Sequence, residues 1–122
     1  MLTEKDYCDY GLIAELEQLG MLIKIDFACG IENGQLVKTK FYPNPPTLYE
    51  AQKWLREEKK IIVEVFVDDD SDTPITYNIY KDGVCVCHHH GKYWSVKEWS
   101  EALSEGIKDA VKILKEDETT HR

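Results

Sequence analysis

The sequence predicts an α+β fold in which helices pack on one face of a mainly antiparallel sheet. Three observations support this prediction. Apolar residues recur at helical spacing in three segments, and they alternate at strand spacing in five others. The turn dipeptides Asn-Gly and Asp-Gly join successive strand segments as hairpins. Because hairpins pair neighbouring strands antiparallel, we expect the order α-β-β-α-β-β-β-α.

The chain has 122 residues, of which 43% are apolar and 31% are charged. This composition is typical of a globular domain and excludes a collagen, a coiled coil and a disordered chain. We expect a single domain over residues 1–115 and a polar tail over residues 116–122. The chain has no apolar run of membrane-spanning length and no basic-then-apolar leader, so we expect a cytoplasmic protein without a membrane partner.

The first half of the chain predicts a helix followed by a hairpin. Leucines recur at helical spacing up to residue 19, which predicts a helix over residues 3–19. Gly20 supplies its C-terminal stop. The residues that follow alternate between apolar and polar types, and the strands of the hairpin are expected over residues 23–29 and 36–42.

The register of this hairpin depends on its turn. A two-residue turn at Asn33-Gly34 pairs Phe27 with Lys40 and mixes lysines with the apolar side chains. A three-residue loop that includes Glu32 shifts the pairing by one and keeps that face apolar. Since a one-residue slip exchanges the two faces of a strand, we expect the three-residue loop.

The second half predicts a helix, three strands and a last helix. Thr47 and Glu50 form a capping box that opens a helix to about Lys59. Its buried stripe should contain Leu48, Ala51 and Leu55, with Trp54 beside them. Three strands are expected over residues 61–67, 75–80 and 84–89. A second capping box at residues 95–98, preceded by Trp94, opens a helix to about Lys115 that should bury Trp99, Leu103, Ile107, Ala110 and Leu114.

Several segments of the chain carry a resemblance to known proteins. They are YGLIAEL (residues 10–16) with Leu19-Gly20, PTLYEAQKWLRE (46–57), IYKDG (79–83), and WSEAL (99–103) with Gly106-Ile107. Together they resemble a group of small, uncharacterised proteins common in phages, prophages and mobile elements of gut anaerobes. The resemblance implies a cytoplasmic setting in a bacterial host and an accessory role, and it implies no activity or cofactor.

Charge narrows the class of partner. The chain carries 15 basic and 23 acidic residues, a net charge of −8. Nucleic-acid binding requires basic patches that release counterions, so we expect no direct nucleic-acid partner. We expect no such partner even though residues 47–115 have the predicted order α-β-β-β-α, which is also the order of double-stranded RNA-binding domains. An acidic surface suits a basic protein partner.

The strongest candidate metal site is the strand that contains Cys85, Cys87 and His89. Zinc binds thiolate sulfur and imidazole nitrogen, and alternate residues of a strand share a face. A two-residue turn at Asp82-Gly83 would leave both cysteines on the outer face, where a metal can reach them. A three-residue loop would place them in the core, and we expect that loop by analogy with the first hairpin. The acidic run at residues 68–72 is interpreted as a solvated hairpin tip.

The remaining signals favour a protein-binding role. The chain lacks a nucleophile elbow, a P-loop and a dinucleotide-binding motif, so we expect no catalytic residues and no cofactor other than zinc at the cysteine strand. Large aromatic residues dominate binding hot spots, which makes Tyr42, Tyr49, Trp54 and Trp94 the candidate partner-binding residues. We expect a non-enzymatic accessory protein that binds an unknown host or phage protein, in one version as an acidic mimic of nucleic acid. The alternative is a small metal- or ligand-binding domain.

Overall fold

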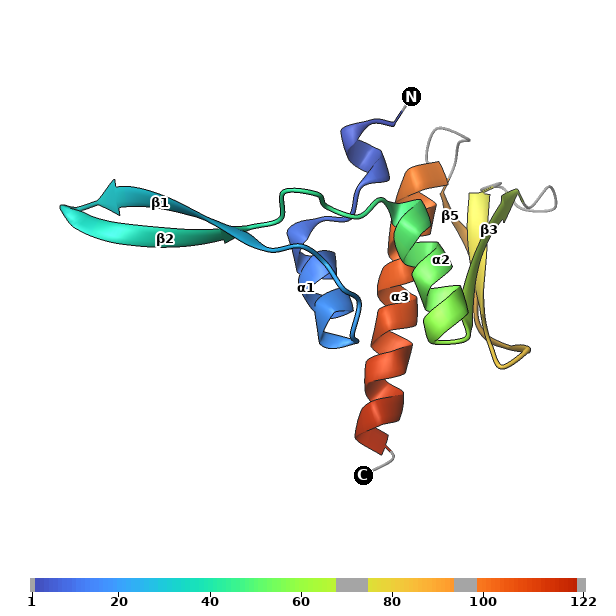
Figure 1. Ribbon diagram of the computed structural model, residues 1–122. Coiled ribbons are helices and arrows are strands. Elements are labelled where there is room, and N and C mark those ends of the chain that lie inside the picture. Colours follow the sequence, from blue (N-terminus) through green and yellow to red (C-terminus); the bar gives the residue numbers. More distant parts are fainter. Residues whose placement is uncertain (1, 68–74, 94–98, 121–122) are drawn as a thin grey trace.

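The described part of the chain, residues 2–67, 75–93 and 99–120, follows the predicted order and confirms the α+β fold class (Figure 1). For residues 87–93 and 118–120 the computed structural model describes the backbone alone. The helices are α1 (Tyr10–Gln18), α2 (Leu48–Glu58) and α3 (Trp99–Thr120), and a 3-10 turn, η1 (Glu4–Asp6), precedes them. The strands are β1 (Asp26–Glu32), β2 (Gln35–Phe41), β3 (Ile61–Val67), β4 (Ile75–Lys81) and β5 (Val84–Tyr93).

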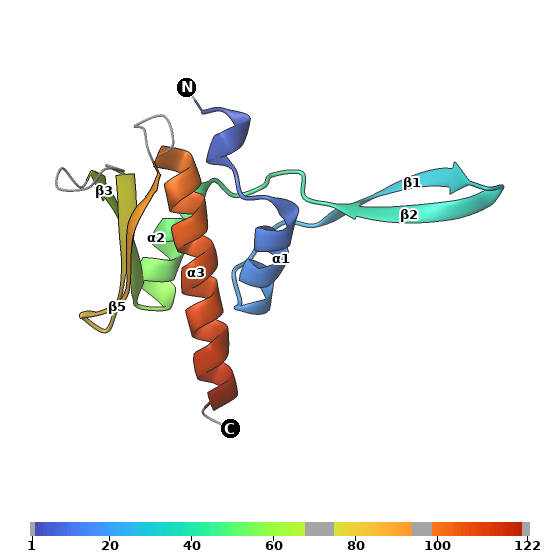
Figure 2. The same ribbon diagram turned by 180° about the vertical axis from the view of Figure 1, so that it is seen from behind.

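Helix α3 occupies the centre of the domain. It packs against α1 on one side and against α2, β3 and β4 on the other (Figures 1 and 2). Its buried residues recur at helical spacing and include four of the predicted stripe, namely Leu103, Ile107, Ala110 and Leu114. Trp99, predicted for the same stripe, is partly exposed.

Strands β3, β4 and β5 form an antiparallel sheet with β4 in the middle. Helices α2 and α3 cover one face of this sheet, as predicted (Figure 1). Alternate residues of the two best-covered strands join the core, namely Ile61, Val63, Ile75, Tyr77 and Ile79. Strands β1 and β2 form a second, two-stranded sheet.

The start of α2 confirms the predicted capping box. The Glu50 amide donates to Thr47 Oγ1 over 3.1 Å, and the Thr47 amide donates to Glu50 Oε1 over 3.1 Å. These bonds satisfy backbone donors that the first turn of a helix leaves without partners. The predicted stripe of Leu48, Ala51 and Leu55 is buried. Trp54 lies beside the stripe and is half-buried.

The β1–β2 hairpin projects from the rest of the domain as a long ribbon (Figure 1). We call residues 26–41 the arm. Every residue of β1 is exposed, and β2 has two partly buried positions, Val37 and Phe41. Because the arm has no core-facing side, burial does not select the register of its strands.

The expected three-residue loop in the arm is wrong. The register pairs Phe27 with Lys40 and Glu32 with Gln35, which leaves a two-residue turn at Asn33 and Gly34. Both turn residues have positive φ, 51° and 76°. Such turns match the right-handed twist of the flanking strands, and this local preference decides the register where no face is buried.

The expected three-residue loop in the second hairpin is also wrong. Lys81 pairs with Val84, and the turn residues Asp82 and Gly83 have φ of 53° and 82°. The register shifts between Tyr80 and Ile79, because Tyr80 pairs with Cys85 whereas Ile79 pairs with Cys87. A bulge of this kind places one extra residue in the longer strand and exchanges the faces beyond it.

The N-terminal helix and the last helix differ from their predicted bounds. Tyr7 and Cys8 interrupt the first segment, and the Asp9 side chain caps α1 from a residue in extended conformation. Helix α3 continues past Lys115 to Thr120, and an ion pair between Lys81 and Asp117 joins its last turns to the end of β4. Trp94, the capping box at residues 95–98 and the acidic run at residues 68–72 lie outside the described residues.

Gly106 permits the close approach of α3 to the sheet. A Cβ atom built at this buried position would lie 2.6 Å from Val63 Cγ1 and 3.3 Å from the Tyr77 ring. The first distance is well below van der Waals contact, and both neighbours are fixed in the core. Helix α3 therefore rests on β3 and β4 at a distance that a larger residue does not allow.

We predict that Gly106→Ala lowers the free energy of unfolding by about 1–3 kcal/mol, because overpacking the core outweighs the better helix propensity of alanine. Gly11→Ala is the matched control, since its Cβ would meet its nearest atom, Asp9 Oδ1, at an ordinary 3.5 Å. The control should be neutral or slightly stabilising. Urea unfolding monitored by circular dichroism measures both values, and equal stability of the two variants would contradict the close-approach argument.

Candidate functional site

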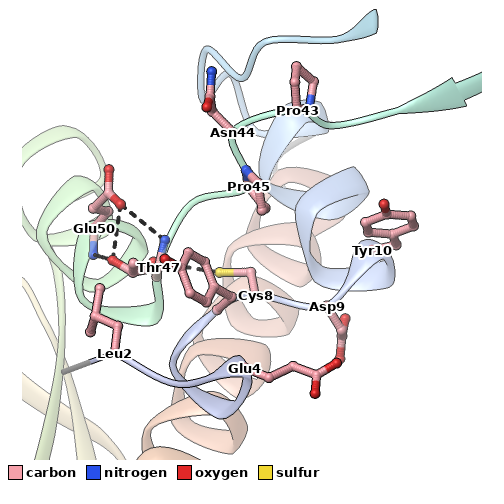
Figure 3. A pocket seen from close by; sticks show the side chains of 11 residues that line it. Leu2, Glu4, Cys8, Asp9, Tyr10, Pro43, Asn44, Pro45, Thr47 and Glu50 are labelled. Atoms are coloured by element: carbon pink, nitrogen blue, oxygen red, sulfur yellow. Dashed lines mark hydrogen bonds between the residues drawn. The ribbon is translucent and has the colours of Figure 1, made fainter. Parts of the chain in front are cut away.

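Two neighbouring surfaces are the candidate sites: the arm and a pocket at its base. The pocket has a volume of about 850 Å³ and lies between the N-terminal segment, the start of α1 and the chain that leaves β2 (Figure 3). We call it the basal pocket. Its lining combines apolar and acidic side chains, namely Leu2, Glu4, Tyr7, Cys8, Asp9, Tyr10, Pro43, Asn44, Pro45, Thr47 and Glu50.

Backbone hydrogen bonds bring the two walls of the basal pocket together. Tyr7 forms an isolated antiparallel bridge with Thr47, and the Cys8 amide donates to the Pro46 carbonyl over 3.0 Å. Prolines in this stretch, which lack the amide donor, keep the second wall extended and end the β2 ladder. The pocket is thus made of segments about forty residues apart in sequence.

The three carboxylates of the basal pocket lie on two sides of it (Figure 3). Glu50 is held by the capping box of α2. Asp9 accepts from the Leu12 amide over 2.8 Å and pairs with Lys108 Nζ at 3.0 Å. These two contacts lower the pKa of Asp9, the backbone hydrogen bond being the larger cause. Glu4 is exposed and has no ion pair within the described residues. The pocket therefore carries net negative charge at neutral pH.

Cys8 forms part of the floor of the basal pocket and is 5% exposed. Its thiol donates to the Thr47 carbonyl over 3.7 Å. Burial raises the pKa of Cys8 to about 12, and the charges of Asp9 and Glu50 add to this effect. A thiol must ionise to act as a nucleophile, so burial disfavours a nucleophilic role for Cys8. Its role in the pocket is to pack.

The arm has two faces of opposite character. One face carries Phe27, Cys29, Ile31, Leu36, Lys38 and Lys40, since the register pairs these residues across the strands. At the tip, Ile31 is 80% exposed and Leu36 is 78% exposed. Behind the tip, Lys38 Nζ lies 4.7 Å from the centre of the Phe27 ring. We call this the basic-apolar face. The other face carries both acidic residues of the arm, Asp26 and Glu32.

A chain of contacts links the basic-apolar face to the basal pocket. Lys40 Nζ lies 5.3 Å from the Tyr42 ring and 3.5 Å from Glu17 Oε1. The Tyr42 hydroxyl donates to Glu17 Oε1 over 2.6 Å, and the Tyr42 ring meets Tyr10 edge-on at 5.4 Å. Tyr10 lines the pocket. The lysine face of the arm thus continues through Tyr42 into the pocket wall.

The predicted partner-binding residues lie in different places. Tyr42 is buried beside the basal pocket, whereas Tyr49 is 43% exposed on α2. Trp54 lies in a separate hollow with Met21, beneath Lys59 Nζ at 5.7 Å from the ring centre. Trp94 lies outside the described residues. The sequence prediction did not find the basal pocket or the arm tip; the proline run after residue 42 was the available signal for the pocket wall.

The predicted metal site is partly described. Cys85 is exposed and pairs with Tyr80, whereas the backbone of Cys87 and His89 pairs with Ile79 and Tyr77. Tyr80 lies on the opposite face of β4 from Ile79 and Tyr77, so Cys85 pairs on a different face of the sheet from Cys87 and His89. Among the side chains that the structure describes, no three His, Cys, Asp or Glu groups gather as a metal would require. The cysteine strand as a zinc site stays a prediction.

Comparison of the chain with protein-family models, with curated proteins and with solved structures found no match. Over the described residues, the helices do not combine the length and hydrophobicity needed to cross a bilayer.

We predict that Asp9→Ala lowers the free energy of unfolding by about 1 kcal/mol at neutral pH, because α1 loses its cap. Asp9→Asn should cost less, since an amide oxygen still caps the helix. The pKa of Asp9 is lowered from 3.8 in the folded protein, so its stabilisation is complete above pH 3.8 and is lost as pH falls through the folded-state pKa. The wild-type advantage over Asp9→Ala should shrink in this acidic range. A pH-independent difference in denaturant midpoints would contradict the assignment.

We predict that alkylation distinguishes the cysteines of the folded chain. Iodoacetamide at pH 8 should label the exposed Cys29 and Cys85 and leave Cys8 unlabelled, because burial and the raised pKa suppress its thiolate. Peptide mass spectrometry after labelling measures each site. Denatured protein is the control, in which Cys8 should react like the others. Equal labelling of Cys8 in the native state would show that the floor of the pocket is open.

Proposed function

We propose that this protein is a non-enzymatic protein-binding module and that the arm is its contact surface. The observation that carries the proposal is the arm itself, a two-stranded ribbon that exposes Ile31 and Leu36 at its tip. Two-stranded ribbons of this kind are marginally stable in water unless another surface covers them. Exposed apolar residues gathered at one place mark interaction sites more often than scattered ones do.

The chemistry of the basic-apolar face specifies the partner surface. An apolar hollow would complement its apolar tip, and a carboxylate would complement Lys38, which has no ion pair within the described residues. Complementary charge of this kind sets partner choice and association rate more than affinity. The partner surface is therefore an apolar hollow edged by acidic residues on a protein. The resemblance to mobile-element proteins suggests a bacterial or phage setting for this binding.

The acidic-mimic version of the function uses a different surface. Outside the arm the chain carries 13 of its 15 basic residues and 21 of its 23 acidic residues, so the arm is neutral and the acid excess belongs to the rest. A basic host protein would bind this excess and ignore the arm tip. Loss of binding in arm-tip variants therefore separates the two versions.

We predict that the double variant Ile31→Ser/Leu36→Ser abolishes association without changing the melting temperature by more than about 2 °C, because exposed side chains contribute little to stability. The measurement is affinity capture of the tagged chain from bacterial cells that also express an untagged copy. Mass spectrometry identifies stoichiometric partners, a second copy of the chain included. Capture that survives the double variant would contradict the proposal.

Val84→Ser is the matched control for this experiment. Val84 is 63% exposed and directly follows the turn of the other hairpin, so it resembles the arm tip in exposure and local structure. The control variant should retain the captured partner. Loss of capture in both variants would indicate a general effect of removing exposed apolar groups.

A further inference from the structure

We infer that the arm of one copy docks in the basal pocket of a second copy, so that the chain forms a two-fold dimer with exchanged arms. This inference rests on the proposed function and names the partner surface that the arm requires. That surface is an apolar hollow edged by carboxylates. The basal pocket fits the description, because Leu2, Tyr7, Tyr10, Pro43 and Pro45 supply its apolar lining and Glu4, Asp9 and Glu50 supply its charge.

Charge complementarity supports this occupant. Lys38 lies two residues behind Leu36 on the same face of β2, about 7 Å from the tip at a rise of about 3.3 Å per residue. When the tip enters the basal pocket, Lys38 therefore reaches the rim. Glu4 is exposed on that rim, and neither Lys38 nor Glu4 has an ion pair within the described residues. A contact between them would pair two charges that have no ion-pair partner among the described residues of one chain.

The position of the pocket excludes the arm of the same chain. Pro43 and Pro45 of the pocket wall belong to the segment that leaves β2, so the pocket lies at the base of the arm. The tip lies at the far end of the ribbon and points away from the domain (Figure 1). A seven-residue strand extends about 20 Å, and folding the tip back would break the ladder between β1 and β2.

The same positions favour a closed dimer. When two arms run antiparallel, each tip lies beside the base of the other arm and hence beside the other copy's pocket. One two-fold axis then forms both contacts, as in other isologous dimers. No open site remains to propagate a fibre. Tyr10, which is 60% exposed and packs edge-on against Tyr42 at the base of the arm, extends the apolar surface of the pocket toward the arm.

The test uses charge reversal at the inferred contact. Sedimentation velocity of the purified full chain at micromolar concentration should show a dimer for the wild type at low salt. The dimer dissociation constant should rise at high salt, because salt screens the charged contacts. Lys38→Glu and Glu4→Lys should each raise the dimer dissociation constant about tenfold or more, since each places like charges in both contacts. An equimolar mixture of the two variants should dimerise like the wild type. In the mixed dimer one contact joins the two substituted side chains, which again have opposite charges, and the other contact joins the native Lys38 and Glu4.

Lys112→Glu is the control for net charge. Lys112 is exposed on α3 and belongs neither to the arm nor to the lining of the basal pocket, so its reversal should leave the dimer unchanged. Far-ultraviolet circular dichroism of every variant checks that the chain is folded. A monomeric wild type, or a dimer that ignores both reversals, would overturn the inference. If the purified chain is monomeric while arm-dependent capture from cells yields another protein, the proposed function stands and the exchanged-arm dimer fails.

Discussion

The approach of α3 to the sheet at Gly106 is the contact on which the other packing depends. The helix lies close to Val63 and Tyr77 of the sheet, and it also contacts α2 and α1, so every other helix of the core packs against it. Tyr77 adds a hydrogen bond from its hydroxyl to Asp109, which fixes the rotation of α3 about its own axis. Small changes at this contact are felt throughout the core, since protein interiors are close-packed.

Polar contacts between α3 and α1 help to position the arm. Lys108 pairs with Asp9, and Lys115 Nζ reaches Glu15 and Gln18 at 3.4 and 2.9 Å. These side chains attach α1 to α3 at both of its ends. Helix α1 in turn supplies Glu17, which receives Tyr42 and Lys40 at the base of the arm. Exposed ion pairs individually contribute little to the free energy of unfolding. Here they flank the apolar contact between α1 and α3 and orient α1 on α3.

The elements whose residues face the core could be predicted from the sequence. Periodicity in the sequence predicts the buried stripe of α2, the alternation at the start of β3 and four of the five residues expected in the stripe of α3. The capping box at Thr47 has the predicted hydrogen bonds. The arm could not be predicted in the same way. The prediction of a three-residue loop assumes that one face of the hairpin is buried. The arm has no buried face, and the turn at Asn33-Gly34 sets the register instead.

The basal pocket was beyond sequence reasoning for a different reason. Its walls meet through the bridge between Tyr7 and Thr47, a contact between segments that share no pattern in the sequence. Cys8 carries no motif, and its burial follows from this meeting alone. Aromatic content did point toward Tyr42, which lies between the arm and the pocket, but it did not indicate Tyr10, which lines the pocket wall.

The exposure of the arm has a consequence for how this protein can change over evolutionary time. Substitutions in a core must keep the chain above the stability needed to fold, and most of them lower that stability. Residues 27–40 are largely outside this constraint, because their side chains are solvated in the single chain. Their sequence is constrained by the surface that the arm binds, so a substitution in the arm can alter recognition while the body of the domain stays folded. The ribbon thus separates residues that answer to binding from residues that answer to folding stability.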